Sequence, residues 1–150
     1  MMRKILVLMG LPASGKSSFA AKFIADNPSY RRVNKDSIRE MINFSAWTRK
    51  GESLVQSIRD AVIHEILTAG YDVVIDDTNL QQVHIDKFEQ FAEYYNCELQ
   101  FLYFDVSLEE CIERDSKRVG RVGEEVIRRL WNSRTVDVDK YKCSEYINIC

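Results

Sequence analysis

The chain has 150 residues, of which 45% are hydrophobic, so it matches the size of one compact domain and can bury a core without disulfides or metal ions. Its formal net charge of −2 does not by itself indicate a nucleic-acid partner, because phosphate backbones are bound through concentrated Lys and Arg. The longest apolar run, Ile5–Met9, is too short to span a bilayer, and the first residues lack the apolar region and cleavage site of an export signal.

The cysteines favour a reducing compartment. They are scattered through the chain, at Cys97, Cys111, Cys143 and Cys150. This spacing indicates neither a zinc site nor a disulfide scaffold. We therefore expect reduced thiols and a cytoplasmic protein.

The first half of the chain alternates apolar runs with helical patterns. Ile5–Met9 ends at Gly10 and is typical of a strand buried on both faces of a parallel sheet. Asp36 is well placed to cap the helix that follows it. In chain order we then expect a helix over Lys16–Asp26, a short strand over Arg31–Asn34, a helix over Ser37–Phe44, a polar loop over Trp47–Gly51 and a helix over Leu54–Leu67.

The second half continues the alternation. We expect a strand over Tyr71–Ile75, a helix over Val83–Tyr95, a strand over Leu99–Phe104, and helices over Leu108–Lys117 and Glu124–Arg134, while Tyr146–Ile149 could add a last strand. Strands that alternate with helices predict an α/β fold with a parallel four- or five-stranded sheet covered by helices on both faces. Ligands then bind at the carboxyl ends of the strands. We expect residues 1–150 to form one domain.

Residues 10–17 read Gly-Leu-Pro-Ala-Ser-Gly-Lys-Ser and match the phosphate-binding loop pattern G-x-x-x-x-G-K-[ST]. The loop lies between a predicted strand and a predicted helix, as its mechanism requires. Lys16 should reach the β- and γ-phosphates of ATP, and the hydroxyl of Ser17 should hold Mg²⁺. The expected ATP-binding residues here are Gly10, Pro12, Ala13, Ser14, Gly15, Lys16, Ser17 and Ser18, although Ser18 also suits a plain helix surface.

Two acidic positions are candidates for the acceptor side of the site. Asp77, followed by Thr78 and Asn79, comes at the end of a predicted strand and so at the ligand edge of the sheet, although Asp and Asn also simply terminate strands. Asp36 follows another strand and could accept a proton from an attacking hydroxyl, or it could serve only as a helix cap. Arg39 lies one helical turn later and could clamp a substrate phosphate, or it could be an exposed charge.

A second basic segment predicts a lid. Arg114, Lys117, Arg118 and Arg121 surround Val119–Gly120 between two predicted helices. A cationic lid that closes over ATP would have this composition, and so would a solvated basic turn. We place the lid at about residues 114–124. The whole pattern then predicts a P-loop kinase-like three-layer sandwich with a helical lid.

These motifs, taken in order, resemble the kinase domain of the phage-type 5′-polynucleotide kinases, within the wider P-loop kinase group. The resemblance runs from Lys4 to about Arg134. It rests on residues 10–17, 33–39, 77–80, 104–106 and 114–118.

The resemblance implies transfer of the ATP γ-phosphate to the 5′-hydroxyl end of DNA or RNA. It implies that Asp36 is the general base, that Arg39 binds the adjacent substrate phosphate and that Asp77 organises the acceptor site, by orienting Arg39. It also implies that Arg118 contacts ATP phosphates, with Arg114 and Arg121 as secondary candidates.

Two departures from the family pattern qualify this assignment. Lys35 stands where the family often has Arg, and the chain ends without a carboxyl-terminal phosphatase domain, so no 3′-phosphatase activity is expected. The family context implies a nucleic-acid repair role, with a separate ligase or phosphatase as partner, in the host cytoplasm if the chain is phage-encoded.

Alternatives remain open at this point. The same scaffold suits a kinase of a small molecule such as a nucleoside, sugar acid, antibiotic or toxin-type substrate, and also a non-catalytic nucleotide-binding module. Trp47 could stack on a base or pack in its loop. His64 and His84 lie singly on predicted helices, where a surface or satisfied imidazole is commoner than a ligand.

Overall fold

A computed structural model describes residues 2–43 and 46–142. Its sheet has four parallel strands in the order β2-β3-β1-β4. The strands are β1 (Lys4–Met9), β2 (Tyr30–Val33), β3 (Asp72–Asp76) and β4 (Glu98–Tyr103). The helices are α1 (Lys16–Asp26), α2 (Lys35–Met41), α3 (Arg49–Thr68), α4 (Gln82–Tyr95), α5 (Leu108–Ser116) and α6 (Glu124–Asn132), followed by the 3₁₀ turn η1 (Val138–Tyr141).

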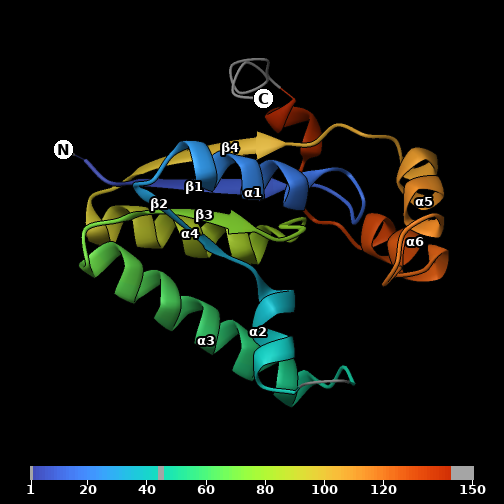
Figure 1. Cartoon of the computed structure of the whole chain (residues 1–150), viewed down its shortest axis with the longest axis horizontal. Coiled ribbons are helices and arrows are strands. Elements are labelled where there is room, and N and C mark those ends of the chain that lie inside the picture. The colour runs from blue at the N-terminus through green and yellow to red at the C-terminus, as the bar shows by residue number, and fades with distance from the viewer. Residues whose placement is uncertain (1, 44–45, 143–150) are drawn as a thin grey trace.

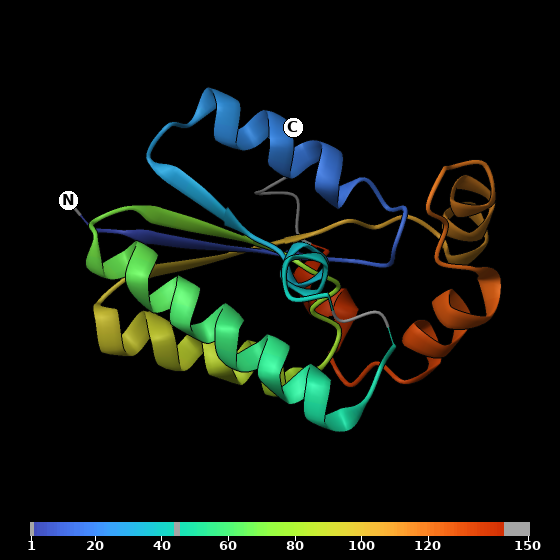
Figure 2. The ribbon, with the colours of Figure 1, turned by 60° about the horizontal axis from the view of Figure 1, so that its bottom comes forward.

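The helices form two layers around the sheet. Helix α1 covers one face, and α3 and α4 cover the other (Figure 2). Helices α5 and α6 lie beyond the carboxyl ends of the strands (Figure 1). The predicted α/β sandwich is therefore confirmed, with four strands in the described part of the chain.

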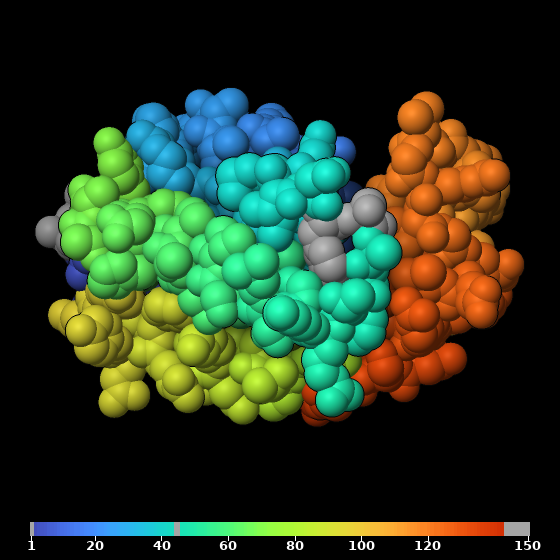
Figure 3. Space-filling view, turned by 90° about the horizontal axis from the view of Figure 1, so that it is seen from below, coloured from blue at the N-terminus to red at the C-terminus, as the bar shows by residue number. Residues whose placement is uncertain are grey.

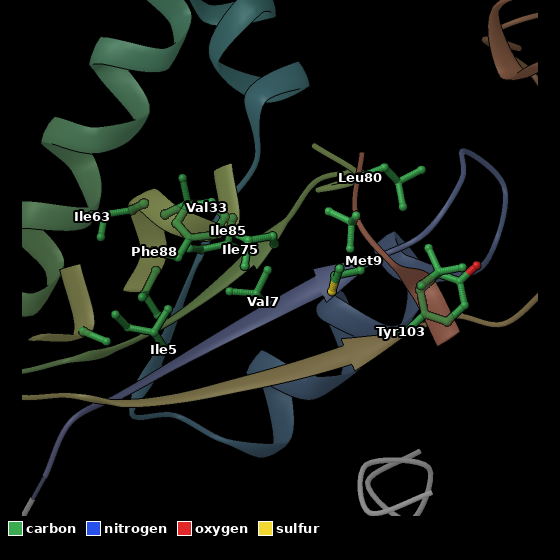
Figure 4. Close-up of a cluster of buried hydrophobic side chains, with 14 of the residues drawn as sticks. Ile5, Val7, Met9, Val33, Ile63, Ile75, Leu80, Ile85, Phe88 and Tyr103 are labelled. Atoms are coloured by element: carbon green, nitrogen blue, oxygen red, sulfur yellow. The ribbon is translucent and has the colours of Figure 1, made fainter. Parts of the chain in front are cut away.

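The central strand β1 is apolar throughout because both of its faces are covered. Leu6 and Leu8 pack in the cluster on the α1 face. Ile5, Val7 and Met9 point to the opposite face and join the larger cluster, where they meet residues such as Phe88 of α4 (Figure 4). All five residues are at most 1% exposed. Burial of each of these side chains stabilises the fold by roughly 2 kcal/mol.

The strand order brings two loops together at the carboxyl edge of the sheet. Strands β1 and β3 are neighbours, with Leu8 paired to Asp76. The backbone amide of Gly10 donates to the carbonyl of Thr78 at 3.0 Å, and Asn79 Nδ2 donates to the carbonyl of Leu8 at 2.7 Å. The segment after β3 is thereby tied to the loop after β1, at the place where doubly wound sheets bind ligands.

Two local predictions are wrong. Asn34, not Asp36, caps α2, because its side chain accepts a hydrogen bond from Ser37 N at 2.9 Å. Helix α3 begins at Arg49, inside the expected loop, because the hydroxyl of Thr48 caps it by accepting from Gly51 N at 3.0 Å.

The chain's termini need two further statements. The suggested strand over Tyr146–Ile149 lies outside the described residues. Among the helices in the described ranges, not one combines the length and the apolar character that crossing a membrane demands.

Candidate active site

The loop between β1 and α1 is a tight cradle. Gly10 has a φ of +152°, and a Cβ on it would lie 2.9 Å from Ser14 Oγ and 3.2 Å from Phe104 Cβ, so a larger residue would displace the loop. Ala13 and Gly15 also have positive φ angles, of 65° and 104°, which only small or permissive residues adopt easily. Such turns form a concave nest of amides for anions, and the N-terminus of α1 adds partial positive charge.

Lys16 lies at the floor of this cradle and is 7% exposed. Its Nζ donates to the carbonyl oxygens of Gly10 at 2.8 Å and Leu11 at 2.7 Å. Burial lowers the pKa of Lys16 to about 8, although the carboxylate of Asp76 acts in the opposite direction. An anion in the cradle would stabilise the charged amine and raise this pKa again.

Two carboxylates end β3 beside the cradle. Asp76 is 1% exposed, and its Oδ2 accepts from Arg32 Nε at 3.0 Å and Nη2 at 2.6 Å. Asp77 Oδ1 accepts from the backbone amide of Lys35 at 2.9 Å, whereas Asp77 Oδ2 is buried and has no partner among the described residues. Burial raises the pKa of Asp77 to about 6, although the ammonium of Lys35 opposes this. Asp76 is thus engaged in an ion pair, whereas one buried oxygen of Asp77 has no partner among the described residues.

On α2, Asp36 and Arg39 lie one turn apart on the same side, as expected, and they form an ion pair. Asp36 Oδ1 accepts from Arg39 Nη1 at 2.7 Å, and the Asp36 side chain is 88% exposed. Arg39 is also held by Glu52, whose carboxylate accepts from Arg39 Nε at 3.1 Å and Nη2 at 2.5 Å. The expectation that Asp77 orients Arg39 is wrong, because Asp77 contacts the Lys35 amide instead and Glu52 takes the orienting position.

These groups line one cleft of about 690 Å³. Figure 3 shows the hollow between the cyan surface around α2 and the orange surface of α5 and α6. The predicted site residues that line it are Pro12, Ala13, Gly15, Lys16, Ser17, Ser18, Asp36, Arg39, Asp77, Thr78, Arg114 and Arg118. Donor-side and acceptor-side candidates therefore share one cavity.

The remaining predicted site residues are not among the described residues that line the cleft. Gly10, Ser14 and Asn79 are buried behind it and shape the loop instead. Arg121 is exposed on the turn between α5 and α6. It therefore stays a prediction for a closed lid only.

Sequence reasoning missed part of the cleft wall. The additional lining residues that carried no assigned role are Asn34, Glu52, Leu80, Gln81, His84, Val122, Val126, Arg129 and Leu130, and Trp47 also lines the cleft with its side chain exposed. Val126 and Leu130 are four positions apart on α6, a helical spacing that places both on one face. That periodicity was the available signal, although it reads equally as core packing.

His84 stands beside a buried arginine. Arg59 is 2% exposed, and its guanidinium lies over the ring of Phe88 at 5.2 Å from the centroid. Arg59 Nη1 lies 3.5 Å from His84 Nδ1, and because arginine can only donate, this contact makes Nδ1 the acceptor and leaves the ring proton on Nε2. Burial lowers the pKa of His84 to about 4, with further effect from Lys35 and Arg59. His84 therefore presents a neutral imidazole to the cleft.

Two arginines of the lid segment reach the cleft. Arg118 is 42% exposed and pairs with Asp115 three positions earlier. Arg114 is 47% exposed and pairs with Glu110 at 3.1 Å. The segment predicted as a lid thus contributes two cationic side chains to the cleft that residues of the phosphate-binding loop also line.

The loop residues fit a magnesium ion. Ser17 is exposed at the first turn of α1 and lines the cleft, so its hydroxyl can ligate a hard cation. Asp77 lines the same cleft, although its Oδ2 is itself buried and has no partner among the described residues.

Comparison with known proteins agrees with this geometry. A family model described as an AAA domain matches residues 5–135. The chain belongs to this AAA domain family. The matched segment contains the phosphate-binding loop, the Asp36–Arg39 pair, β3 and the segment predicted as a lid.

Three relatives of this AAA domain are informative. A protein of Autographa californica nuclear polyhedrosis virus, by name a bifunctional polynucleotide kinase/RNA ligase, is 28% identical over 77% of this chain and 18% of its own length. The L-seryl-tRNA(Sec) kinase of Methanococcus maripaludis is 25% identical over 91% of this chain and 54% of its own length. A chain in the structure of the Pnkp1/Rnl/Hen1 RNA repair complex is 30% identical and superposes with a TM-score of 0.75, over 87% of this chain and 43% of that chain.

These similarities confirm the P-loop kinase fold and the relationship to polynucleotide kinases. The chain spans between about a fifth and just over half of the length of the curated relatives.

Proposed function

We propose that this chain is an ATP-dependent kinase that phosphorylates the 5′-hydroxyl end of DNA or RNA. One observation supports this above the others: Lys16 of the phosphate-binding loop and the Asp36–Arg39 pair line the same cleft. A phosphoryl donor and a hydroxyl acceptor need such opposed groups for in-line transfer.

The donor side binds the triphosphate. The loop amides cradle the phosphates, Lys16 exchanges its carbonyl contacts for β- and γ-phosphate oxygens, and Arg118 approaches from the lid. The Ser17 hydroxyl would hold Mg²⁺, and the bound ion would supply charge neutralisation at the phosphate oxygens. Catalysis on this side is charge stabilisation in a fixed geometry.

The acceptor side supplies a base and a clamp. The Asp36 carboxylate takes the proton of the 5′-hydroxyl while the 5′-oxygen forms a bond to the γ-phosphorus. The bond between the γ-phosphorus and the oxygen that bridges it to the β-phosphate breaks, which releases ADP. Arg39, held on Glu52, uses its remaining N–H groups to bind the phosphate on the 3′ side of the terminal nucleotide. Asp77 orders the start of α2 through the Lys35 amide.

The relatives' names support this acceptor class. One is named as a polynucleotide kinase fused to an RNA ligase, and another belongs to an RNA repair complex. A 5′-phosphate end is the product that an end-joining ligase consumes, so we propose a ligase as the functional partner, with a phosphatase where ends carry a 3′-phosphate.

A second candidate acceptor is a hydroxyl on a group other than a strand end. The similarity to L-seryl-tRNA(Sec) kinase, at 25% identity over 91% of the chain, favours it. In that case Asp36 would deprotonate a different alcohol, and Arg39 would bind a different anion or none. Small-molecule alcohols belong to the same alternative.

An acceptor screen tests the proposal. The purified chain is given γ-labelled ATP and Mg²⁺ with a 5′-hydroxyl oligodeoxynucleotide, the matching oligoribonucleotide, seryl-tRNA and a panel of nucleosides and sugar acids. We expect label on the 5′-hydroxyl oligonucleotides and none on the same strands with a 5′-phosphate. Lys16→Ala should reduce transfer by about a hundredfold or more, whereas Lys22→Ala, an exposed lysine on the same helix, should leave transfer unchanged. Label on seryl-tRNA or a small molecule alone would instead establish the second candidate.

A further inference from the structure

Asp115 is a buried carboxylate at the end of α5, next to the lid turn. Its residue is 1% exposed although it is charged. Oδ1 accepts from Arg118 Nε at 2.9 Å and from the backbone amide of Val122 at 2.9 Å, and Oδ2 accepts from the amide of Gly123 at 2.8 Å. A single side chain thereby joins the start of the turn, its functional arginine and its end.

The two amides explain why this turn closes at all. Gly123 is the N-cap residue, immediately before α6 begins at Glu124, and it makes no side-chain capping hydrogen bond. Amides at a helix N-terminus need acceptors, and a negative charge is favourable there. Burial would raise the pKa of Asp115, but the amides of Val122 and Gly123 and the guanidinium of Arg118 hold that pKa below its usual value. The carboxylate is therefore ionised in its function as a cap.

The contact with Arg118 fixes the direction of the guanidinium. Arg118 Nε and Nη2 both lie 2.9 Å from Asp115 Oδ1, so the edge bearing these two nitrogens faces the carboxylate. The Nη1 group and the second Nη2 hydrogen remain for another anion. Because Arg118 lines the cleft, this remaining edge is the one available to a phosphate.

We propose that Asp115 is a positioning residue for phosphoryl transfer: it folds the lid turn before the nucleotide binds and aims Arg118 at the donor phosphates. The proposal rests on the proposed function, in which Arg118 contacts ATP. The basic turn after α5 is held in place by the Asp115 carboxylate. Asp115 itself touches no substrate and acts through Arg118.

A double-mutant cycle tests this role. Asp115→Asn keeps the shape and one acceptor, but it removes the charge and sets an amide donor against the Gly123 amide. We expect it to reduce kcat by about tenfold or more in the wild-type background and by less than about twofold in an Arg118→Ala background. Glu113→Gln is the matched control, since Glu113 is an exposed acid on the same helix that pairs only with Lys117 among the described residues; it should leave kcat unchanged.

Two outcomes would overturn the proposal. One is that Asp115→Asn reduces kcat by the same factor with and without Arg118, which indicates a purely structural cap. The other is a kcat equal to wild type. The melting temperature of each variant shows whether a loss of kcat comes from a folding defect or from the coupling between Asp115 and Arg118.

The inference can also be separated from the proposed function. Should the wild-type chain phosphorylate no acceptor, the same cycle is measured on the affinity for a fluorescent ATP analogue with Mg²⁺. Loss of affinity in Asp115→Asn only when Arg118 is present supports the positioning role without any acceptor. Equal losses in both backgrounds refute it.

Discussion

Arg39 on α2 donates both its Nε and its Nη2 to the carboxylate of Glu52 on α3, thirteen residues further along the chain. This paired contact, at 3.1 and 2.5 Å, fixes one edge of the guanidinium. Burial by itself would lower the pKa of Arg39, but the hydrogen bonds and negative charges of Glu52 and Asp36 outweigh this effect and raise that pKa. In the proposed function, a substrate phosphate would meet an arginine whose orientation is already set, which would reduce the entropy lost on binding.

Glu52→Gln should weaken the acceptor site without harming the donor site. The amide leaves a half-buried guanidinium with one charged partner fewer, so Arg39 loses its fixed direction. We expect the KM for a 5′-hydroxyl oligonucleotide to rise about tenfold while the KM for ATP stays within about twofold. Arg39→Ala should give a similar or larger rise. Glu65→Gln, an exposed acid on the same helix, should give wild-type kinetics, and a Glu52→Gln enzyme indistinguishable from it would contradict the orienting role.

Asp36→Asn should remove the base and leave nucleotide binding intact. The amide can still contact Arg39 but cannot take a proton, so we expect kcat to fall by about a hundredfold or more. Titration with an ATP analogue should give wild-type affinity. Glu40→Gln, an exposed acid on the same helix, serves as the control. Transfer by Asp36→Asn at more than a tenth of the wild-type rate would show that another group accepts the proton.

Asp77→Asn should make the fold more stable at neutral pH while impairing transfer. The folded-state pKa of Asp77 is raised from 3.8 to about 6, chiefly by burial, so the folded protein binds more protons than the unfolded chain between these values. Its contribution to stability therefore falls as pH rises through this range, by about 3 kcal/mol at most. Asn removes this cost and keeps an acceptor for the Lys35 amide. Urea unfolding at pH 7.5 should show a higher free energy of unfolding for Asp77→Asn, and a lower one would refute the assignment.

The same experiment at lower pH should show the difference closing. Below about pH 3, under both the folded-state and the unfolded-state pKa, the carboxyl of wild-type Asp77 is neutral in both states, so the stability difference between the two proteins should stop changing with pH and reach its smallest value. The comparison must be made as a difference between variants. His84 acts in the opposite direction, because its lowered pKa makes the unfolded chain bind more protons between about 4 and 6.5.

His84 should remain neutral through the working pH range. Burial, Lys35 and Arg59 lower its pKa to about 4, and the contact with Arg59 places the ring proton on Nε2. Nitrogen-15 NMR of the imidazole should show this tautomer, with no titration between pH 8 and about 5. His64→Gln identifies which of the two histidine signals belongs to His84. A His84 signal that titrates with a midpoint near 6.5, or one from the other tautomer, would contradict the arrangement.

Contiguous residues made the donor half of the site predictable. The pattern from Gly10 to Ser17 specifies its own backbone, because the glycines permit the positive φ angles and the apolar run before them can only be a buried strand. Helix α1 was expected with the bounds that the structure shows. The cap of α2 was predicted at Asp36 and that prediction is wrong, because Asn34, another good capping residue, takes this position. The structure favours Asn34, whose amide also donates to the carbonyl of Asp76.

The acceptor half depends on residues that no local pattern connects. Glu52 reaches Arg39 because α3 packs beside α2, and His84 reaches Arg59 from 25 positions away because α4 packs beside α3. That Asp77 Oδ2 is buried without a partner among the described residues is visible only in the tertiary structure. Asp115 belonged to the 114–118 motif but had no role assigned, because its partners Val122 and Gly123 lie beyond the turn that follows α5.

The amino-acid order alone therefore determined the strand-loop-helix that grips phosphate, the alternation that makes the sheet parallel, and the carboxylate and arginine one turn apart on α2. Local backbone preferences and hydrophobic periodicity act over a few neighbouring residues, so they can be predicted from the sequence alone. Which acid holds which arginine, and which side chains meet in the cleft, was decided only by the packing of helices distant in sequence, since a charge's partner is whichever group the fold brings within a few ångströms of it.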